Sequence, residues 1–173
     1  MTAAADVTMT PLNGELEMSL TATLIPEAEL RAATASDLPA IERLLAASAL
    51  PLAGVADSLS GFVVAEHEGV IVGTAALEAC CNNALLRSVA VAPEWRARGL
   101  GRALVTRVIG DAEARGIRAL YLLTTTAERY FPSFGFQPIA REEVPADVRE
   151  TEEFRSACPA TAAVMCRKCA PTD

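Results

Sequence analysis

The stretch Trp95–Val105, WRARGLGRALV, places two glycines one residue apart, between a group of arginines and an apolar helical pattern. Glycine allows a tight backbone turn and lets an anion approach the chain with no Cβ in the way. The free N–H groups at the start of the following helix, together with the positive end of its dipole, then point at that anion. The stretch therefore predicts a phosphate-binding turn that opens a helix.

Two familiar phosphate loops do not fit this turn. The dinucleotide fingerprint needs a third glycine three residues after the second, and Leu104 stands there. The triphosphate loop needs Gly-Lys-Ser or Gly-Lys-Thr, a triplet that this turn lacks. The remaining pattern is Arg96-x-x-Gly99-x-Gly101, and the arginines of residues 96–102 can form charge-assisted bonds to a pyrophosphate.

Composition narrows the class of ligand. The 173 residues are 51% hydrophobic and carry a net charge of −7, from 15 Lys plus Arg and 22 Asp plus Glu. This balance argues against a protein that coats nucleic acid or an anionic membrane, so we expect neither as a partner. A local group of arginines on an acidic chain instead indicates a small anionic ligand.

The sequence also indicates an expected location. We find no run of ~18 apolar residues of the kind that spans a membrane and no signal peptide at the start of the chain. An odd count of five cysteines suggests reduced thiols and a cytoplasmic setting. Cys80-Cys81 and Cys166-x-x-Cys169 have ligand-like spacing, but a lone pair at a chain end is a weak metal signal, and we expect no metal.

The order of expected elements indicates a mixed α/β sheet with helices on its faces. Strands are expected at residues 29–34, on both sides of a hairpin turn at Gly69, and at 84–92, 118–125, 136–140 and 160–168. Helices are expected after a Ser36 N-cap, after the glycine turn as far as Gly116, from Thr125 to Gly135, and over 142–155. We expect a poorly ordered arm over 1–27, a single domain over 28–169 and a tail at 170–173.

Two segments carry a family resemblance. VAVAPEWRARGLGRALV, residues 89–105, resembles motif A of the GNAT superfamily of acetyl-CoA-dependent N-acetyltransferases, and YFPSFGF, residues 130–136, resembles its motif B. The resemblance covers roughly residues 30–168. It implies a central, mostly antiparallel sheet of six or seven strands that is splayed in the middle, acetyl-CoA as cosubstrate, and a homodimer.

The resemblance also implies a donor site. The backbone of Val89, Ala90 and Val91 would pair with the pantetheine amides, and an N–H near Val89 would bind the thioester oxygen as negative charge develops on it. The pyrophosphate would lie against Arg96, Ala97, Arg98, Gly99, Leu100, Gly101 and Arg102. The acceptor amine attacks directly, so no nucleophilic side chain is expected.

Proton transfer requires a base, and a general acid would help the thiolate leave. Glu78, at the inner end of its strand, is the favoured base, with Glu66, His67 or an ordered water as alternatives. Many family members place a general-acid Tyr four residues before the glycine of the GF pair, where this chain has Phe131. Tyr130 is one residue away, a rotation of ~100° on a helix that would point it elsewhere. A thiol of pKa ~8.5 leaves without much help.

The acceptor is indicated by two branches of the family. Residues 123–136 and 144–159 resemble amino-acid N-acetyltransferases, notably the domain that acetylates glutamate. LPLAGV, LLRSVAVAPEWR, LLTTTAE and EFRSACP look like the branch associated with arsenic-resistance genes, some of whose members acetylate amino-acid-like arsinates or phosphinates. Either branch implies a small acceptor with a primary amine.

An amino-acid acceptor needs a fixed cation for its carboxylate. Arg87 and Arg155 are candidates, with Ser156 beside Arg155 where the glutamate-acetylating relatives keep Arg and Ser. The alternative is that both arginines form salt bridges with the acidic segment 142–153. Other open functions are acetylation of aminoglycosides or protein amines, and a CoA-binding sensor domain without turnover.

Overall fold

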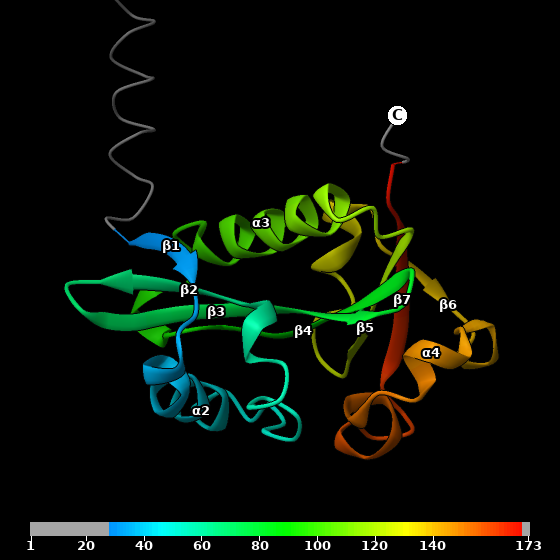
Figure 1. The fold of residues 1–173 in the computed structure, drawn as a ribbon, viewed down its shortest axis with the longest axis horizontal. Helices are drawn as coiled ribbons and strands as arrows, with labels where there is room; N and C mark the ends of the chain where they lie inside the picture. The colour runs from blue at the N-terminus through cyan, green and yellow to red at the C-terminus, as the bar shows by residue number, and fades with distance from the viewer. Residues whose placement is uncertain (1–27, 171–173) are drawn as a thin grey trace, which may run out of the picture.

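The computed structural model describes residues 28–170, so the expected arm at 1–27 and residues 171–173 of the tail lie outside the described residues. All strands join one seven-stranded sheet in the order β1-β2-β3-β4-β5-β7-β6 (Figure 1). Each neighbouring pair is antiparallel except β4 and β5, which run parallel. This confirms the mixed, mostly antiparallel sheet. The strands are β1 Glu29–Ala32, β2 Phe62–His67, β3 Val70–Cys80, β4 Asn83–Val91, β5 Ala119–Thr124, β6 Gln137–Ile139 and β7 Ala163–Lys168.

Helices cover both faces of the sheet. Helix α3 (Leu100–Ala114) lies on one face, and α2 (Leu38–Ala47) and α4 (Ala146–Arg149) lie on the other (Figure 1). Short turns complete the chain: η1 Ala35–Asp37, η2 Leu59–Gly61, η3 Pro93–Trp95, η4 Phe131–Phe134, η5 Arg141–Glu143, and the π-helical turn η6 Glu153–Ala157. Among residues 28–170, none of the helices is both long and apolar enough to cross a membrane.

Each helix buries an apolar stripe against the sheet. The buried residues of α3 include Leu100, Leu104, Val108 and Ala112, which lie on one side of the helix. On the opposite face, Ile41 and Leu45 of α2 pack with residues of β2, β3 and β4. Val148 of α4 and Phe154 of η6 pack with β4 and β5. These contacts hold the C-terminal turns close to the middle of the sheet.

Two expected helices are wrong in extent. The segment 142–155 is not one helix but η5, α4 and η6, because Pro145 has no N–H to donate and precedes a new helix start. Residues 125–135 form turns and η4, because the Thr124 hydroxyl accepts the N–H of Ala127 at 2.9 Å and holds the chain in a turn. The expected N-cap Ser36 lies inside η1, and Thr34 caps that turn instead.

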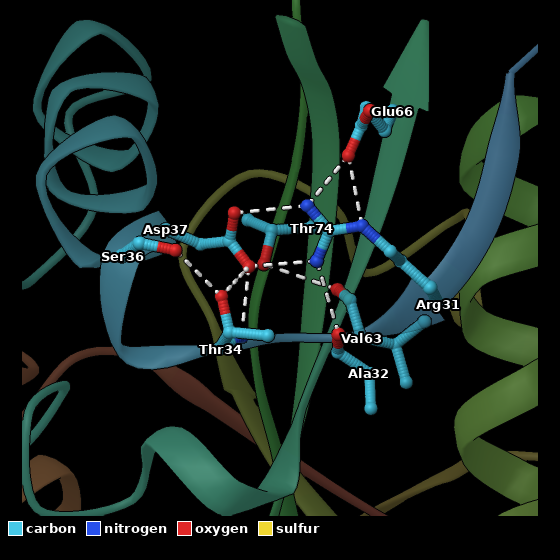
Figure 2. A network of polar contacts seen from close by, with 8 residues as sticks. All are labelled: Arg31, Ala32, Thr34, Ser36, Asp37, Val63, Glu66 and Thr74. Atoms are coloured by element: carbon cyan, nitrogen blue, oxygen red, sulfur yellow. Dashed lines mark hydrogen bonds and ion pairs between the residues drawn. The ribbon is translucent and has the colours of Figure 1, made fainter. Parts of the chain in front are cut away.

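A charged network fixes the start of the fold. Figure 2 shows the Arg31 guanidinium of β1 between Asp37 and Glu66. Arg31 donates to both oxygens of Asp37 at 2.7 and 2.9 Å, and to Oε2 of Glu66 at 2.6 and 2.8 Å. Asp37 also accepts the backbone N–H of Thr34 at 2.7 Å. The guanidinium holds the pKa of the Asp37 carboxyl well below its usual range.

Replacing Asp37 by Asn tests this network. Because the folded pKa of Asp37 is lowered, its charge stabilises the fold above about pH 4, and the contribution is lost as the pH falls. We expect the free energy of unfolding to drop by about 2 kcal/mol at pH 7. The difference from the wild type should narrow below about pH 4. Urea denaturation followed by circular dichroism, with the exposed Asp57→Asn as control, measures both. A difference that is unchanged at pH 3 would contradict the assignment.

Candidate functional site

The sheet opens between its two parallel strands. β4 and β5 pair only over a short stretch, in which Asn83–Leu85 of β4 face Ala119–Tyr121 of β5. Beyond this point β4 carries a bulge against β3, where the pairing moves from Ala76–Arg87 to Thr74–Ala90. A bulge bends and twists its strand, and Ser88 at the bulge has a φ of +55°. The expected splay in the middle of the sheet is therefore present, next to the bulge.

A cavity of about 440 Å³ fills this opening. We call it the strand cavity. Its wall runs along the bulged half of β4 and the unpaired end of β5, and reaches the glycine turn. It is lined by Leu50, Pro51, Leu86, Arg87, Ser88, Val89, Ala90, Val91, Arg96, Gly101, Leu122, Leu123, Thr124, Thr126, Ala127, Tyr130, Phe131 and Glu153. The sequence-predicted residues Val89, Ala90, Val91, Arg96 and Gly101 thus meet in one cavity.

The two glycines of the turn have different tasks. Gly99 caps α3 with a φ of +82°, a left-handed conformation that side chains disfavour. Gly101 is needed for space, because a Cβ there would lie 3.2 Å from the Tyr130 hydroxyl and 3.6 Å from Val91 Cγ2. The backbone at the start of this 15-residue helix is therefore open to a ligand, with its N–H groups and dipole favouring an anion.

The three arginines of the turn keep their charge available. Arg96 donates to the Val91 carbonyl at 3.0 Å, Arg98 lies 5.4 Å from the centre of the Trp95 ring, and Arg102 lies 4.9 Å from that of Phe134. All three are exposed, and within residues 28–170 none of them pairs with a carboxylate. These side chains fit a pyrophosphate. Ala97 and Leu100, the other two residues predicted here, contribute backbone to the same turn.

Arg87 is placed differently from a free substrate-binding cation. It is 2% exposed, and although it lines the strand cavity, its donors are occupied. It pairs with Glu78 Oε2 and Glu153 Oε2, both at 2.7 Å, and donates to the Ala53 carbonyl at 2.6 Å. Arg87 thus forms the alternative salt bridge with the acidic segment 142–153, and this salt bridge is buried. Its guanidinium therefore orders neighbouring carboxylates.

The two predicted proton-transfer residues lie apart from each other. Glu78 is ion-paired to Arg87, and its side chain is 22% exposed, but it does not line the strand cavity. Tyr130 does line that cavity. Residues 128–130 form a turn and not a helix, so Tyr130 is not rotated away from the site as expected. Partial burial raises the pKa of Tyr130, so the phenol keeps its proton near neutral pH.

Glu153 is a cavity residue that the sequence analysis missed. It is 5% exposed and lines both the strand cavity and a neighbouring one of about 470 Å³, which we call the second cavity. The second cavity is lined by Ala49, Leu50, Pro51, Leu123, Thr124, Thr125, Thr126, Glu153, Ala157, Cys158, Pro159 and Ala162. Burial raises the pKa of Glu153. In the sequence, Glu153 lies in the acidic segment 142–153, and residue type alone does not distinguish it from the exposed glutamates of that segment.

The predicted acceptor-binding pair lies on the surface of η6. Arg155 and Ser156 are exposed and line neither cavity. Ser156 donates to the Glu152 carbonyl at 3.2 Å and to the Glu152 carboxylate. No ion pair or side-chain hydrogen bond of Arg155 is found among residues 28–170. Arg155 is therefore exposed to solvent, two residues before Ala157 of the second cavity's lining.

Four of the five cysteines have thiols that are harder to ionise than a free thiol. Burial raises the pKa of Cys80 to about 12 and that of Cys158 to about 11, which keeps both thiols protonated. Cys166 and Cys169 also have raised pKa values through burial. In the described part of the chain, no group of three or more His, Cys, Asp or Glu side chains is arranged to hold a metal ion.

Known proteins that are similar to this chain include acetyltransferases. Residues 58–138 match the family model described as an acetyltransferase (GNAT) domain. Amino-acid acetyltransferases from Aeromonas salmonicida and Pseudomonas fluorescens are 36% and 38% identical over 88 and 87 residues, 50% and 49% of this chain. The matched segment is 20% of the length of each of these relatives.

Solved structures extend the likeness beyond that segment. N-acetylglutamate synthase from Neisseria gonorrhoeae, complexed with coenzyme A and N-acetyl-glutamate, has a TM-score of 0.72 at 25% identity, over 83% of this chain and 35% of that one. A Mycobacterium tuberculosis protein in complex with CoA has a TM-score of 0.71 at 26% identity, over 82% of this chain and 99% of that one. With the splayed sheet and the glycine turn, these matches show that residues 58–138 are similar to an acetyltransferase (GNAT) domain and that the surrounding fold resembles those of CoA-binding proteins.

Proposed function

We propose that this chain transfers the acetyl group of acetyl-CoA to the primary amine of a small, amino-acid-like acceptor. The observation that carries the proposal is the strand cavity, which runs from the gap between β4 and β5 to the glycine turn at the start of α3. A site of this shape suits a long, narrow donor with a thioester at one end and a pyrophosphate at the other.

The residues present fit this donor. The backbone of residues 89–91 borders the strand cavity on the unpaired side of β4, where extended chain can bind amides of a pantetheine arm. Residues 96–102 offer exposed arginines, a left-handed glycine and a helix start to the pyrophosphate. Bound there, acetyl-CoA would supply an activated acyl group to the centre of the sheet.

The acceptor class rests on the relatives and on the surface beside the second cavity. The relatives with 36–38% identity are amino-acid acetyltransferases, and one structural neighbour binds N-acetyl-glutamate. Arg155 is exposed and forms no ion pair among residues 28–170, so it is available to the carboxylate of an amino acid. An amino-acid-like arsinate or phosphinate acceptor, a homodimer and a cytoplasmic location remain predictions.

A panel of acceptors tests the proposed activity. Thiol release from acetyl-CoA is measured with L-glutamate, L-glutamine, L-alanine, phosphinothricin, a lysine-containing peptide and kanamycin. We expect acceptor-dependent release with at least one of the amino acids or with phosphinothricin, and a slower reaction with the peptide and kanamycin. Tight CoA binding without acceptor-dependent release would instead indicate a CoA-binding sensor.

Gly101→Val tests the donor site. A valine side chain would occupy the open backbone at the start of α3 and displace the Tyr130 hydroxyl, which lies on an exposed side chain that can move. We therefore expect a folded protein whose Kd for CoA, measured by titration calorimetry, rises at least about 10-fold, or ~1.4 kcal/mol. Gly110→Val, in the same helix with open space around it, is the matched control. Equal CoA affinity in both variants would refute the pyrophosphate assignment.

Arg155→Ala tests the acceptor carboxylate. Because Arg155 is exposed, its removal should leave the melting temperature unchanged. We expect KM for the preferred amino acid to rise about 10-fold, the size of one lost charge-assisted hydrogen bond, with an unchanged KM for acetyl-CoA. The amide of the same amino acid, which lacks the carboxylate, should show no such increase. A KM that rises equally for both would mean that Arg155 does not read the carboxylate.

A further inference from the structure

The strand cavity and the second cavity share a wall. Its members are Leu50, Pro51, Leu123, Thr124, Thr126 and Glu153. Glu153 is the charged member of this wall, and it is buried at the start of η6. An acceptor in the second cavity would therefore meet a carboxylate on its way to a thioester in the strand cavity.

The lining of the second cavity suits a cation. Apart from Glu153, its lining consists of alanines, leucines, prolines, threonines and Cys158, whose thiol is held protonated by burial. No lysine or arginine lines it. A carboxylate among neutral walls, partly withdrawn from water, attracts an ammonium group more strongly than it would at the surface.

The two oxygens of Glu153 are engaged differently. Oε2 lies 2.7 Å from Arg87 Nε, in an ion pair that fixes the position of the carboxylate. Oε1 accepts a long hydrogen bond of 3.8 Å from the Cys158 thiol. A carboxylate oxygen has lone pairs for more than one donor, so Oε1 keeps the capacity to accept an N–H from a bound amine.

We propose that Oε1 of Glu153 binds the ammonium group of the acceptor in the second cavity and takes its proton before the amine attacks. This assignment rests on the proposed function and deepens it: Glu153 becomes the base, and Glu78 becomes a positioning residue that acts through Arg87. The acceptor is recognised by its amine inside the cavity, and any carboxylate that it carries stays at the mouth.

The reaction removes two protons from the acceptor nitrogen. The ammonium gives one proton to Glu153, and the nitrogen lone pair then forms a bond to the thioester carbonyl carbon. The C–S bond breaks and its electron pair leaves with the sulfur. The second proton lost by the nitrogen goes to the thiolate, and Glu153 releases its proton to solvent. The products are the N-acetylated amine, the free thiol and one proton.

The groups around Glu153 set the pH at which it works. They are Arg87 on β4, Glu78 on β3 and Cys158 after η6. Burial raises the pKa of Glu153, Arg87 lowers it, and the charge of Glu78 raises it. Because the base must be ionised, kcat/KM should increase with pH as Glu153 loses its proton, giving an acidic limb that belongs to this residue.

Two carboxylate variants distinguish the two possible bases, because both residues pair with Arg87 and one of them lines the cavities. With the fastest amine of the acceptor panel, Glu153→Gln should lower kcat/KM about 100-fold or more and remove the acidic limb. Glu78→Gln should keep the limb and shift it to lower pH, since a charge that raises the pKa of Glu153 is lost and Arg87 is freed to lower it. The exposed Glu150→Gln is the surface control. The reverse pattern, with the limb lost in Glu78→Gln, would overturn the assignment.

A third variant and a binding measurement distinguish a catalytic role of Glu153 from a purely structural one. Glu153→Asp keeps the charge but shortens the side chain, so it should reduce kcat and retain the acidic limb. Titration of the panel amines into the CoA-loaded protein, which cannot transfer acetyl, should give an affinity that falls at least about 10-fold in Glu153→Gln. CoA affinity, measured in parallel, should stay the same.

The outcomes separate this inference from the proposed function. A wild type that binds a panel amine through Glu153 but transfers no acetyl would refute the proposed activity and retain the amine site. A wild type that transfers acetyl, with Glu153→Gln equal to it in rate, pH limb and amine affinity, would overturn the inference alone. A wild type whose CoA-loaded form binds none of the panel amines would also overturn it.

Discussion

The structure depends on one interruption: β4 and β5 start as hydrogen-bonded parallel neighbours and then separate. A sheet normally satisfies its backbone groups by continuous pairing, so an unpaired inner edge is costly unless something else binds there. The bulge at Ser88 directs β4 away from β5, while the antiparallel pairing of β4 with β3 and of β5 with β7 holds each half in place. The protein thus keeps open, in the middle of its sheet, a gap lined with extended backbone that is suited to a ligand with amide groups.

The second constraint is a buried group of three charges. Arg87 is inaccessible to solvent and is shared by Glu78 and Glu153, so the group has one negative charge in excess. A buried guanidinium needs such partners, because the desolvation of an unpaired charge would cost several kcal/mol. Burial raises the pKa of Glu153, the more buried carboxylate, and the charge of Glu78 adds to this effect although Glu153 touches an arginine. A group of this kind positions a carboxylate and leaves it able to accept a proton.

Most of the fold could be predicted from the sequence, because its signals are local. Alternating apolar residues, a hairpin turn at Gly69 and the period of α3 specify those strands and that helix. The glycine turn was also predictable, because Gly99 and Gly101, one residue apart at the start of a helix, are typical of a turn that binds an anion. The segment 142–155 was not, because Pro145 divides it into turns whose directions depend on packing against β4 and β5.

The polar part of the site was less predictable for the same physical reason. Arg87 and Glu78 were singled out by residue type, but their pairing depends on which face of the sheet each one occupies. Glu153 could not be told from its acidic neighbours, since its burial arises from the π-helical turn that follows Glu152. Tyr130 was expected to point away on a helix, and it reaches the cavity because that helix does not form.

The most direct test of the account is a crystal structure of the protein with CoA. We predict pantetheine in the gap between β4 and β5, bordered by Val89, Ala90 and Val91, and the pyrophosphate against the N–H groups of residues 96–102. CoA bound elsewhere on the molecule, or a strand gap filled by side chains while CoA is bound, would contradict the account.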